Sequence, residues 1–345
     1  MPHAFNKNSS SSCAPVQSIS ARPFGLSKKP KIKTLILGCG RMGAGTGSRS
    51  QRLSSHAGVL SSIARFQTFL SDCDPNSARQ AASTLGLEIL EKIEKKSFES
   101  FDCALVCTPT KDHFKQLRQL MESRIPLIIC EKPVCSNIRE LRSLEKIRRN
   151  FQGRILVNYT RRFLPSYAKL KKQFSRLLQA ESLKCCAIRY QRGFLNNASH
   201  ALDLAQFLTG WDITKARIEI LQGVNDEFPD DPTLSCIGKW NGASLSVVGL
   251  PEVKFSLFEI DFFFERSAIR LRDRGDTIEV ARSGKPAGYY APLATYKTSR
   301  GNLQEPLRHL YEHVQKMFRD PKIPDNFDES VKLTRWMLET LKRKN

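Results

Sequence analysis

KTLILGCGRMG (residues 33–43) is the most informative segment of the sequence, because it joins a short apolar run to a glycine-rich turn. This pattern predicts a buried parallel strand followed by a turn that binds the phosphates of a dinucleotide. The first glycine, Gly38, would permit the bend, Gly40 would let the backbone approach a pyrophosphate, and Gly43 would let the next helix pack on the strand. The positive end of that helix would attract the phosphates. The alternative is a strand-to-helix loop that binds no ligand.

Two aspartates, Asp72 and Asp74, follow a second apolar run at residues 66–70. In a dinucleotide-binding domain an acidic side chain at this point holds the hydroxyls of the adenosine ribose and repels a 2′-phosphate. We assign this role first to Asp74 and second to Asp72, and we therefore predict NAD as the cofactor in preference to NADP. The alternative is that one of the two aspartates only caps the helix that begins near Ser77.

The spacing between glycine turn and acidic residue is unusual. Gly40 and Asp74 are 34 residues apart, whereas about 20 is common. The surplus falls in residues 44–55, which are rich in Gly, Ser and Arg. This composition predicts an inserted loop beside the phosphate site.

The composition limits the class of protein. A chain of 345 residues with 40% hydrophobic content can form two domains with their own cores. Its 55 Lys and Arg against 34 Asp and Glu give a net charge of +21, which can attract nucleic acid, an anionic membrane or an anionic small molecule. The sequence has no zinc finger, RNP-like motif or basic heptad helix, so nucleic acid is the least favoured partner. No apolar run approaches the roughly 18 residues of a membrane helix.

The ten cysteines form no CxxC pair. Cys103, Cys107 and Cys130 lie in apolar, strand-like runs, and Cys185 adjoins Cys186. We therefore expect most of them to be buried and reduced in a cytoplasmic protein, and we predict no metal site.

The chain divides into four segments. Residues 1–32 contain no acidic residue and are rich in serine, which predicts a disordered basic tail, with an organelle transit peptide as the alternative. Residues 33–158 alternate strands and helices and predict a doubly wound parallel sheet of the Rossmann type. Residues 159–320 contain many strand-like runs and predict an α+β domain with an open, largely antiparallel sheet. Residues 321–345 are expected to form a C-terminal helix. The predicted fold class is α/β.

Six motifs, in order, connect the two expected domains: GCGRMG at 38–43, CDPN at 73–76, CTPTKDH at 107–113, CEKP at 130–133, NYTRRFLP at 158–165 and GFLNNASHALDL at 193–204. Through these motifs the chain resembles the glucose-fructose oxidoreductase and inositol dehydrogenase (Gfo/Idh/MocA) family over most of residues 33–210. The C-terminal third matches only in its sheet-like character. The resemblance implies a hydride transfer between NAD or NADP and a hydroxyl-bearing carbon of a sugar, cyclitol or nucleotide sugar. It also implies a homodimer or homotetramer built through the second sheet.

The resemblance implies two catalytic residues, Lys132 and His200. Lys132 would lie between the nicotinamide and the reacting oxygen and stabilise charge there. His200 would exchange the hydroxyl proton, because histidine titrates near neutrality. The alternatives are an exposed lysine at a strand end and a buried core histidine. Pro133 would shape the backbone beside the nicotinamide, with a cis peptide bond in the 131–133 region. The cofactor-binding residues implied by the motifs are Gly38, Gly40, Arg41, Met42, Gly43, Asp74, Thr108, Pro109, His113, Glu131, Lys132 and Pro133.

The substrate would be bordered by side chains from the last two motifs, namely Asn158, Tyr159, Arg161, Arg162, Asn196 and Asp203. The family often has an aspartate four residues before the histidine, where this chain has Asn196. An amide cannot accept a proton, although it can bind a hydroxyl. Asparagine is frequent here in members of surface-polysaccharide pathways, which favours a sugar or nucleotide sugar. The pair Arg161 and Arg162 suits a carboxylate or phosphate, with surface arginines at a helix start as the alternative.

Three functions are compatible with these residues. The first is an NAD-dependent dehydrogenase of a sugar, cyclitol or nucleotide sugar. The second is a glycosidase that keeps NAD bound and eliminates the aglycone after transient oxidation of the sugar. The third is a non-catalytic NAD-binding regulator or nucleic-acid partner, which the net charge of +21 favours.

Overall fold

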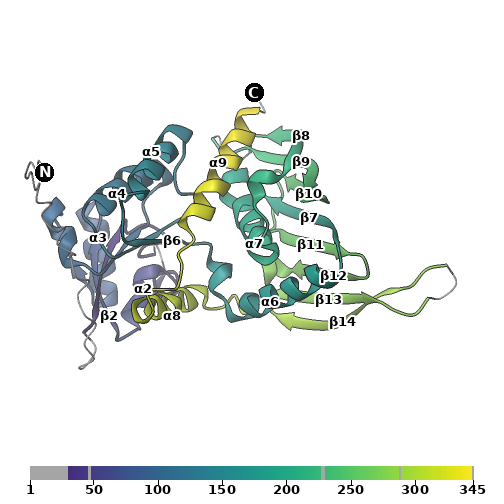
Figure 1. Cartoon of the computed structure of the whole chain (residues 1–345). Helices are drawn as coiled ribbons and strands as arrows, with labels where there is room; N and C mark the ends of the chain where they lie inside the picture. The colour runs from purple at the N-terminus through teal and green to yellow at the C-terminus, as the bar shows by residue number, and fades with distance from the viewer. Residues whose placement is uncertain (1–29, 46–47, 227–229, 287–288, 344–345) are drawn as a thin grey trace, which may run out of the picture.

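The computed structural model describes residues 30–45, 48–226, 230–286 and 289–343 (Figure 1). The predicted tail, residues 1–32, therefore lies outside the described residues except for its last three positions. Ile32 is already the first residue of strand β1.

The first sheet has six parallel strands in the order β3-β2-β1-β4-β5-β6. The strands are β1 (Ile32–Leu37), β2 (Phe66–Ser71), β3 (Glu88–Ile89), β4 (Cys103–Val106), β5 (Leu127–Cys130) and β6 (Arg154–Val157). Every residue of β4 and β5 is buried, as expected for parallel strands covered by helices on both faces. The strand order reverses between β1 and β4, where ligands bind in doubly wound sheets. The predicted Rossmann sheet is confirmed.

Five helices of the first half of the chain accompany this sheet: α1 (Arg49–Leu53), α2 (His56–Ser61), α3 (Pro75–Leu85), α4 (Thr110–Glu122) and α5 (Ile138–Arg148). The surplus segment is not only a loop, since it contains α1. Ser48 and Gln51 cap this helix by reciprocal side-chain to backbone hydrogen bonds. The backbone N–H groups of His56 and Ala57 in α2 donate to the carbonyls of Met42 and Gly43. After the inserted residues, the chain therefore brings the start of α2 into contact with the glycine turn.

Helix α8 (Pro306–Arg319) corrects the predicted domain boundary. Residues 306–319 were expected in the second domain, but α8 packs on the first. Leu310, Val314 and Met317 are fully buried in one apolar cluster with Ile36 and Leu70 of the first sheet. The amphipathic pattern of α8 indicates a helix that covers a core, and it cannot indicate which of two cores is covered.

The second sheet has eight strands in the order β14-β13-β12-β11-β7-β10-β9-β8. Neighbours are antiparallel except for β7 and β10, which are parallel. The strands are β7 (Leu183–Gln191), β8 (Arg217–Val224), β9 (Thr233–Trp240), β10 (Ala243–Leu250), β11 (Phe258–Phe264), β12 (Ser267–Arg272), β13 (Thr277–Ser283) and β14 (Leu293–Arg300). The open, largely antiparallel sheet is confirmed. Strand β14 was not predicted, because its side chains are nearly all exposed and show no apolar alternation.

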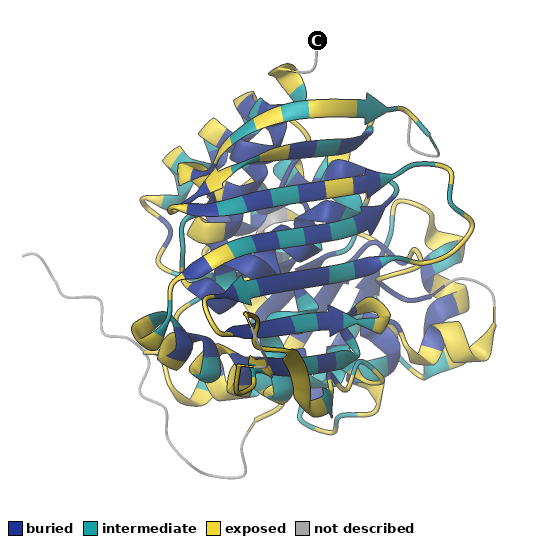
Figure 2. Cartoon of the chain, turned by 90° about the vertical axis from the view of Figure 1, so that its right-hand side faces the viewer, coloured by how far each residue is buried: buried dark blue, intermediate teal, exposed yellow. Residues whose placement is uncertain are grey.

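Helices α6 (Pro165–Ala180) and α7 (Ser199–Thr209) cover one face of this sheet, and α9 (Phe327–Arg343) lies between the two domains (Figure 1). Phe174 of α6 packs edge-on against Phe262 of β11, with ring centroids 4.7 Å apart. In Figure 2 the opposite face of the sheet is turned to the viewer, and none of the described helices covers it. This open face exposes Ile237 and Val248 by 43% and 40%. It also carries an ion-pair ladder in which Asp261 binds both Arg189 and Arg272.

Candidate functional site

Two adjoining cavities lie at the carboxyl ends of the first sheet's strands. The larger, of about 920 Å³, extends from the glycine turn past Asp72 to α4. The smaller, of about 650 Å³, reaches from the glycine turn to the start of α7. Gly40, Thr108 and Pro109 line both. A single extended molecule bound at the switch point of the sheet can therefore occupy the two cavities together.

The three glycines of the turn have different surroundings. Gly38 has φ +97°, and a Cβ on Gly43 would come within 1.8 Å of the Gly38 carbonyl oxygen. These two positions therefore require glycine for the backbone to close on itself. Around Gly40, in contrast, no described atom outside this residue and its two chain neighbours lies within 4 Å of a Cβ built there. Gly40 thus borders open space in both cavities, which suits the close approach of a pyrophosphate.

The two aspartates after β2 have separate tasks. Asp74 is the exposed N-cap of α3, and its carboxylate accepts hydrogen bonds from the backbone N–H groups of Asn76 and Ser77. Asp72 lines the larger cavity and accepts a hydrogen bond of 2.6 Å from the backbone N–H of Cys39 in the glycine turn. The structure thus places Asp72, the second choice of the sequence analysis, in the cavity wall, and Asp74 outside the lining of either cavity.

His113 ties together two of the predicted cofactor loops. Its Nε2 lies 2.9 Å from the carbonyl oxygen of Thr108, and its Nδ1 lies 2.9 Å from that of Pro133. The Lys132–Pro133 peptide bond is cis, in the region where the resemblance implied one. Pro133 itself does not line the cavities, whereas Arg41, Met42, His113 and Glu131 line the smaller one.

Glu131 is held by a buried network that the sequence analysis did not identify. Its Oε1 accepts hydrogen bonds from Nε2 of His56 at 2.9 Å and from Nδ2 of Asn158 at 2.7 Å. The Nδ1 of His56 lies 2.5 Å from the hydroxyl of Tyr311 in α8. Burial alone would raise the pKa of Glu131, but the hydrogen bonds from His56 and Asn158 and the charge of Lys132 bring it below its usual value. No motif pointed to His56 or Tyr311, because His56 follows the surplus segment and Tyr311 lies in the distant helix α8.

Lys132 extends from the first domain to the second. Its Nζ donates to the side-chain oxygen of Asn196 at 2.5 Å and to the backbone oxygen of the same residue at 2.7 Å. An ammonium has three donors, so one remains for a ligand in the cavity. Burial lowers the pKa of Lys132, and the carboxylates of Glu131 and Asp231 oppose this effect. Asp231 also accepts hydrogen bonds from the backbone N–H groups of Leu195 and Asn196. Asp231, which no motif had indicated, is therefore a carboxylate bound to the backbone of Asn196.

His200 stands at the start of α7, after a π-helical turn, Phe194–Ala198, and faces the smaller cavity together with Lys132 and Asn196. Burial, with the charges of Lys132 and Arg161, holds the pKa of His200 well below its ordinary value of 6.5. The edge of the Tyr159 ring contacts the imidazole, with centroids 5.9 Å apart. His200 is therefore neutral near pH 7 and can accept a proton. Tyr159 packs against its ring but does not line the cavity.

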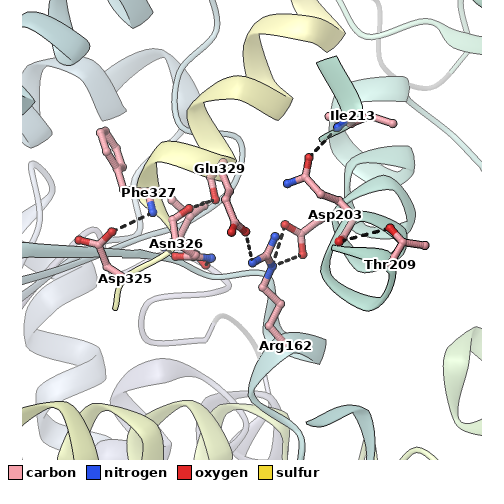
Figure 3. Close-up of polar contacts among 11 residues, drawn as sticks. Arg162, Asp203, Thr209, Ile213, Asp325, Asn326, Phe327 and Glu329 are labelled. Atoms are coloured by element: carbon pink, nitrogen blue, oxygen red, sulfur yellow. Dashed lines mark hydrogen bonds and ion pairs between the residues drawn. The ribbon is translucent and has the colours of Figure 1, made fainter. Parts of the chain in front are cut away.

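Arg161 and Arg162, predicted as a pair, are separated by the structure. Arg161 lines the smaller cavity. Arg162 points away from it and is neutralised by two carboxylates, Asp203 at 2.8 Å and Glu329 at 2.6 Å (Figure 3). Arg162 and Asp203 therefore connect α7 to α9 in a structural ion-pair cluster. Of the predicted substrate residues, Asn158, Arg161 and Asn196 line the smaller cavity, and the others do not.

The described ranges contain no group of three or more His, Cys, Asp or Glu side chains arranged to hold a metal ion. Their helices also include none that is both long and apolar enough to cross a membrane. Six of the nine described cysteines are buried, in line with the sequence analysis.

Comparison with known proteins agrees with this geometry. Residues 32–159 match the family described as oxidoreductase family, NAD-binding Rossmann fold (GFO_IDH_MocA). An inositol 2-dehydrogenase from Mycolicibacterium smegmatis is 31% identical over 145 residues, which cover 41% of this chain and 39% of that protein. An inositol 2-dehydrogenase from Rhizobium meliloti is 23% identical over 189 residues, covering 51% of this chain and 54% of that protein.

The similarity over the whole chain is structural. The crystal structure of a UDP-N-acetylglucosamine 3-dehydrogenase from Acidithiobacillus ferrooxidans superposes with a TM-score of 0.69 at 15% identity, covering 90% of this chain and 95% of that one. At this identity the likeness shows the shared fold alone. The sequence matches span only 39% and 54% of the length of the two inositol dehydrogenases named above.

The unequal surroundings of two glycines give a test of the turn. Gly43→Ala should lower the free energy of unfolding by about 1–3 kcal/mol, because the new methyl group meets the Gly38 carbonyl. Gly40→Ala should change stability by less than about 0.5 kcal/mol but weaken NAD binding at least about tenfold, since the methyl group fills the approach of a pyrophosphate. Denaturation and calorimetric titration with NAD measure the two effects. Undiminished NAD binding by Gly40→Ala would contradict this placement of the cofactor.

Proposed function

Because its first domain belongs to the Gfo/Idh/MocA oxidoreductase family, we propose that the protein is an NAD-dependent dehydrogenase that oxidises a hydroxyl-bearing carbon of a sugar, cyclitol or nucleotide sugar. One observation carries this proposal. The amine of Lys132 and the imidazole of His200 come from different domains and line the same smaller cavity, which also borders the glycine turn.

The residues present fit a dinucleotide. The open space at Gly40 would accommodate a pyrophosphate, and Asp72 in the wall of the larger cavity would be available to the adenosine ribose. Thr108 and Pro109, which line both cavities, would contact the middle of the molecule. When bound, the nicotinamide supplies the acceptor for the hydride. Glu131 and Lys132 lie where its ribose and ring would enter the smaller cavity.

Lys132 and His200 divide the work at the hydroxyl group. The free N–H of Lys132 donates a hydrogen bond to the reacting oxygen and stabilises negative charge that develops there. His200, held neutral by its surroundings, accepts the hydroxyl proton and returns it in the reverse direction. Asn196 orients Lys132 through two accepted hydrogen bonds and does not itself take the proton.

The open face of the second sheet supports an assembly of this chain into a homodimer or homotetramer. The face exposes Ile237 and Val248 and carries charges that are already paired with one another. An apolar and internally neutralised surface of this kind suits contact with a second copy.

Replacement of Lys132 tests the proposed function. Lys132→Ala should lower kcat/KM by about 10²–10³-fold, the usual cost of one lost oxyanion donor, with NAD still bound. NADH formation is followed with a panel of sugars, cyclitols and UDP-sugars, and Lys172→Ala on the exposed surface of α6 is the control. Full turnover by Lys132→Ala would refute the proposal.

The pH profile tests the role of His200. Because the pKa of His200 lies well below 6.5 and the neutral imidazole is the proton acceptor, kcat/KM for oxidation should remain constant down to pH 6.5 and fall only below it. Lys132→Met removes one of the two neighbouring charges and should move the acid limb of the residual activity to higher pH. An acid limb above pH 7 in the wild type would contradict this assignment.

Cofactor choice separates the two aspartates. Asp72→Ser should reduce the preference for NAD over NADP, measured as a ratio of kcat/KM values, at least about tenfold, because the carboxylate that repels the 2′-phosphate is gone. Asp74→Ser retains a capping hydroxyl and should leave this ratio unchanged. If Asp74→Ser alone changes the ratio, the ribose lies against Asp74.

A further inference from the structure

Arg161 is a half-buried cation without a carboxylate partner among the described residues. It lies in a short 3₁₀ turn, Thr160–Phe163, between β6 and α6. Its Nη2 donates to the backbone oxygen of Arg274 at 2.7 Å, and its guanidinium carbon lies 3.9 Å from the centroid of the Phe258 ring. Its Nε is buried and makes no hydrogen bond of good geometry, and the hydroxyl of Tyr167 is the polar side-chain group beside the guanidinium. In the described chain, no carboxylate forms an ion pair with this guanidinium.

The neighbouring Arg162 shows how the fold neutralises a buried arginine that has only a structural role. Two carboxylates, Asp203 and Glu329, surround it (Figure 3), and they keep its pKa above the usual value although burial opposes this. Burial lowers the pKa of Arg161, the neighbouring Tyr167 hydroxyl opposes this effect in part, and the nearby Arg274 lowers the pKa further. An uncompensated buried charge is costly. The contact with Phe258 offsets only about 2 kcal/mol of such a cost.

The cavity that Arg161 lines is positively charged. Arg41, Lys132 and Arg161 all contribute to its lining, and Glu131 is its one acidic residue among those described. The Oε1 of Glu131 is already bound by His56 and Asn158. The charges of Lys132 and Arg161 both reach His200 and lower its pKa. A positive field therefore surrounds the place where the reacting hydroxyl would lie.

We propose that the substrate carries an oxyanion, a carboxylate or a phosphate, that binds Arg161 while a hydroxyl of the same molecule is held by Lys132 and His200. This inference rests on the proposed dehydrogenase function and narrows its substrates to acidic sugars. The oxyanion supplies the negative charge that no described carboxylate gives to Arg161. It accepts hydrogen bonds from the planar, forked N–H donors of the guanidinium. It takes no part in bond making, since only the C–H and O–H bonds of the alcohol are broken.

The test compares acidic and neutral substrates. D-gluconate and D-glucuronate represent carboxylates, D-glucose 6-phosphate represents phosphates, and D-glucose and myo-inositol are neutral. The wild type should prefer the better anion over its neutral counterpart by at least about tenfold in kcat/KM. In Arg161→Gln this preference should fall at least about tenfold, mainly through KM, as expected for lost ground-state binding. Arg161→Lys should keep part of it, because the charge remains and the forked geometry does not.

Arg162→Gln is the matched variant for stability. It leaves Asp203 buried without its partner and should lower the melting temperature. Arg161→Gln removes an unpaired, half-buried charge and should leave the melting temperature unchanged or raise it. A large loss of stability in Arg161→Gln would show that the guanidinium has a structural role, and would overturn the proposal.

Binding measurements separate this inference from the proposed function. The anion that binds should raise the melting temperature of the NAD-loaded wild type and have little effect on NAD-loaded Arg161→Gln, whether or not turnover occurs. If neutral sugars are oxidised as well as the acidic ones by both proteins, the anion site is refuted and the dehydrogenase stands. If no substrate is oxidised while the anion binds through Arg161, the dehydrogenase is refuted and the anion site stands.

Discussion

The closure of the glycine turn on itself is the contact on which the rest of the site depends. Gly43 packs so closely on the carbonyl of Gly38 that no side chain fits between them. The carbonyl of Gly43 is thereby placed to accept the N–H of Ala57, which brings α2 back to the turn. His56, beside Ala57, then reaches Glu131, the neighbour of Lys132. One steric constraint in the first motif therefore orients side chains in the smaller cavity, next to Lys132.

The reactive end of the site is completed only by the second domain. The hydrogen bonds from Lys132 to Asn196 join the end of β5 to the π-helical turn before α7. Asn326, before α9, accepts a hydrogen bond from the backbone N–H of Val157 in β6. Such contacts fix the position of one domain relative to the other. Since Lys132 and His200 come from different domains, their mutual placement depends on this interface.

Electrostatics distinguishes two groups of cations in this protein. The outer ladder around Asp261 and the cluster around Arg162 pair every cation with a carboxylate. The cavity residues Lys132 and Arg161 instead donate to amide or backbone oxygens. These oxygens orient the two cations without cancelling their charge. Their charge remains available to lower the pKa of His200 and to attract an anion.

Local sequence patterns were enough to predict the Rossmann sheet, the open second sheet and the approximate positions of Lys132 and His200. Apolar runs, glycine spacing and motifs at strand ends are local features, and they specify local geometry. Only the tertiary structure decided that α8 covers the first sheet, that His56 and Asp231 support the site, and that Asp72 lines the cavity in place of Asp74. It also gives Arg161 and Arg162, adjacent in sequence, opposite surroundings. These outcomes depend on which partners the fold brings from distant segments, such as Glu329 for Arg162 and Tyr311 for His56, and no local pattern records those encounters.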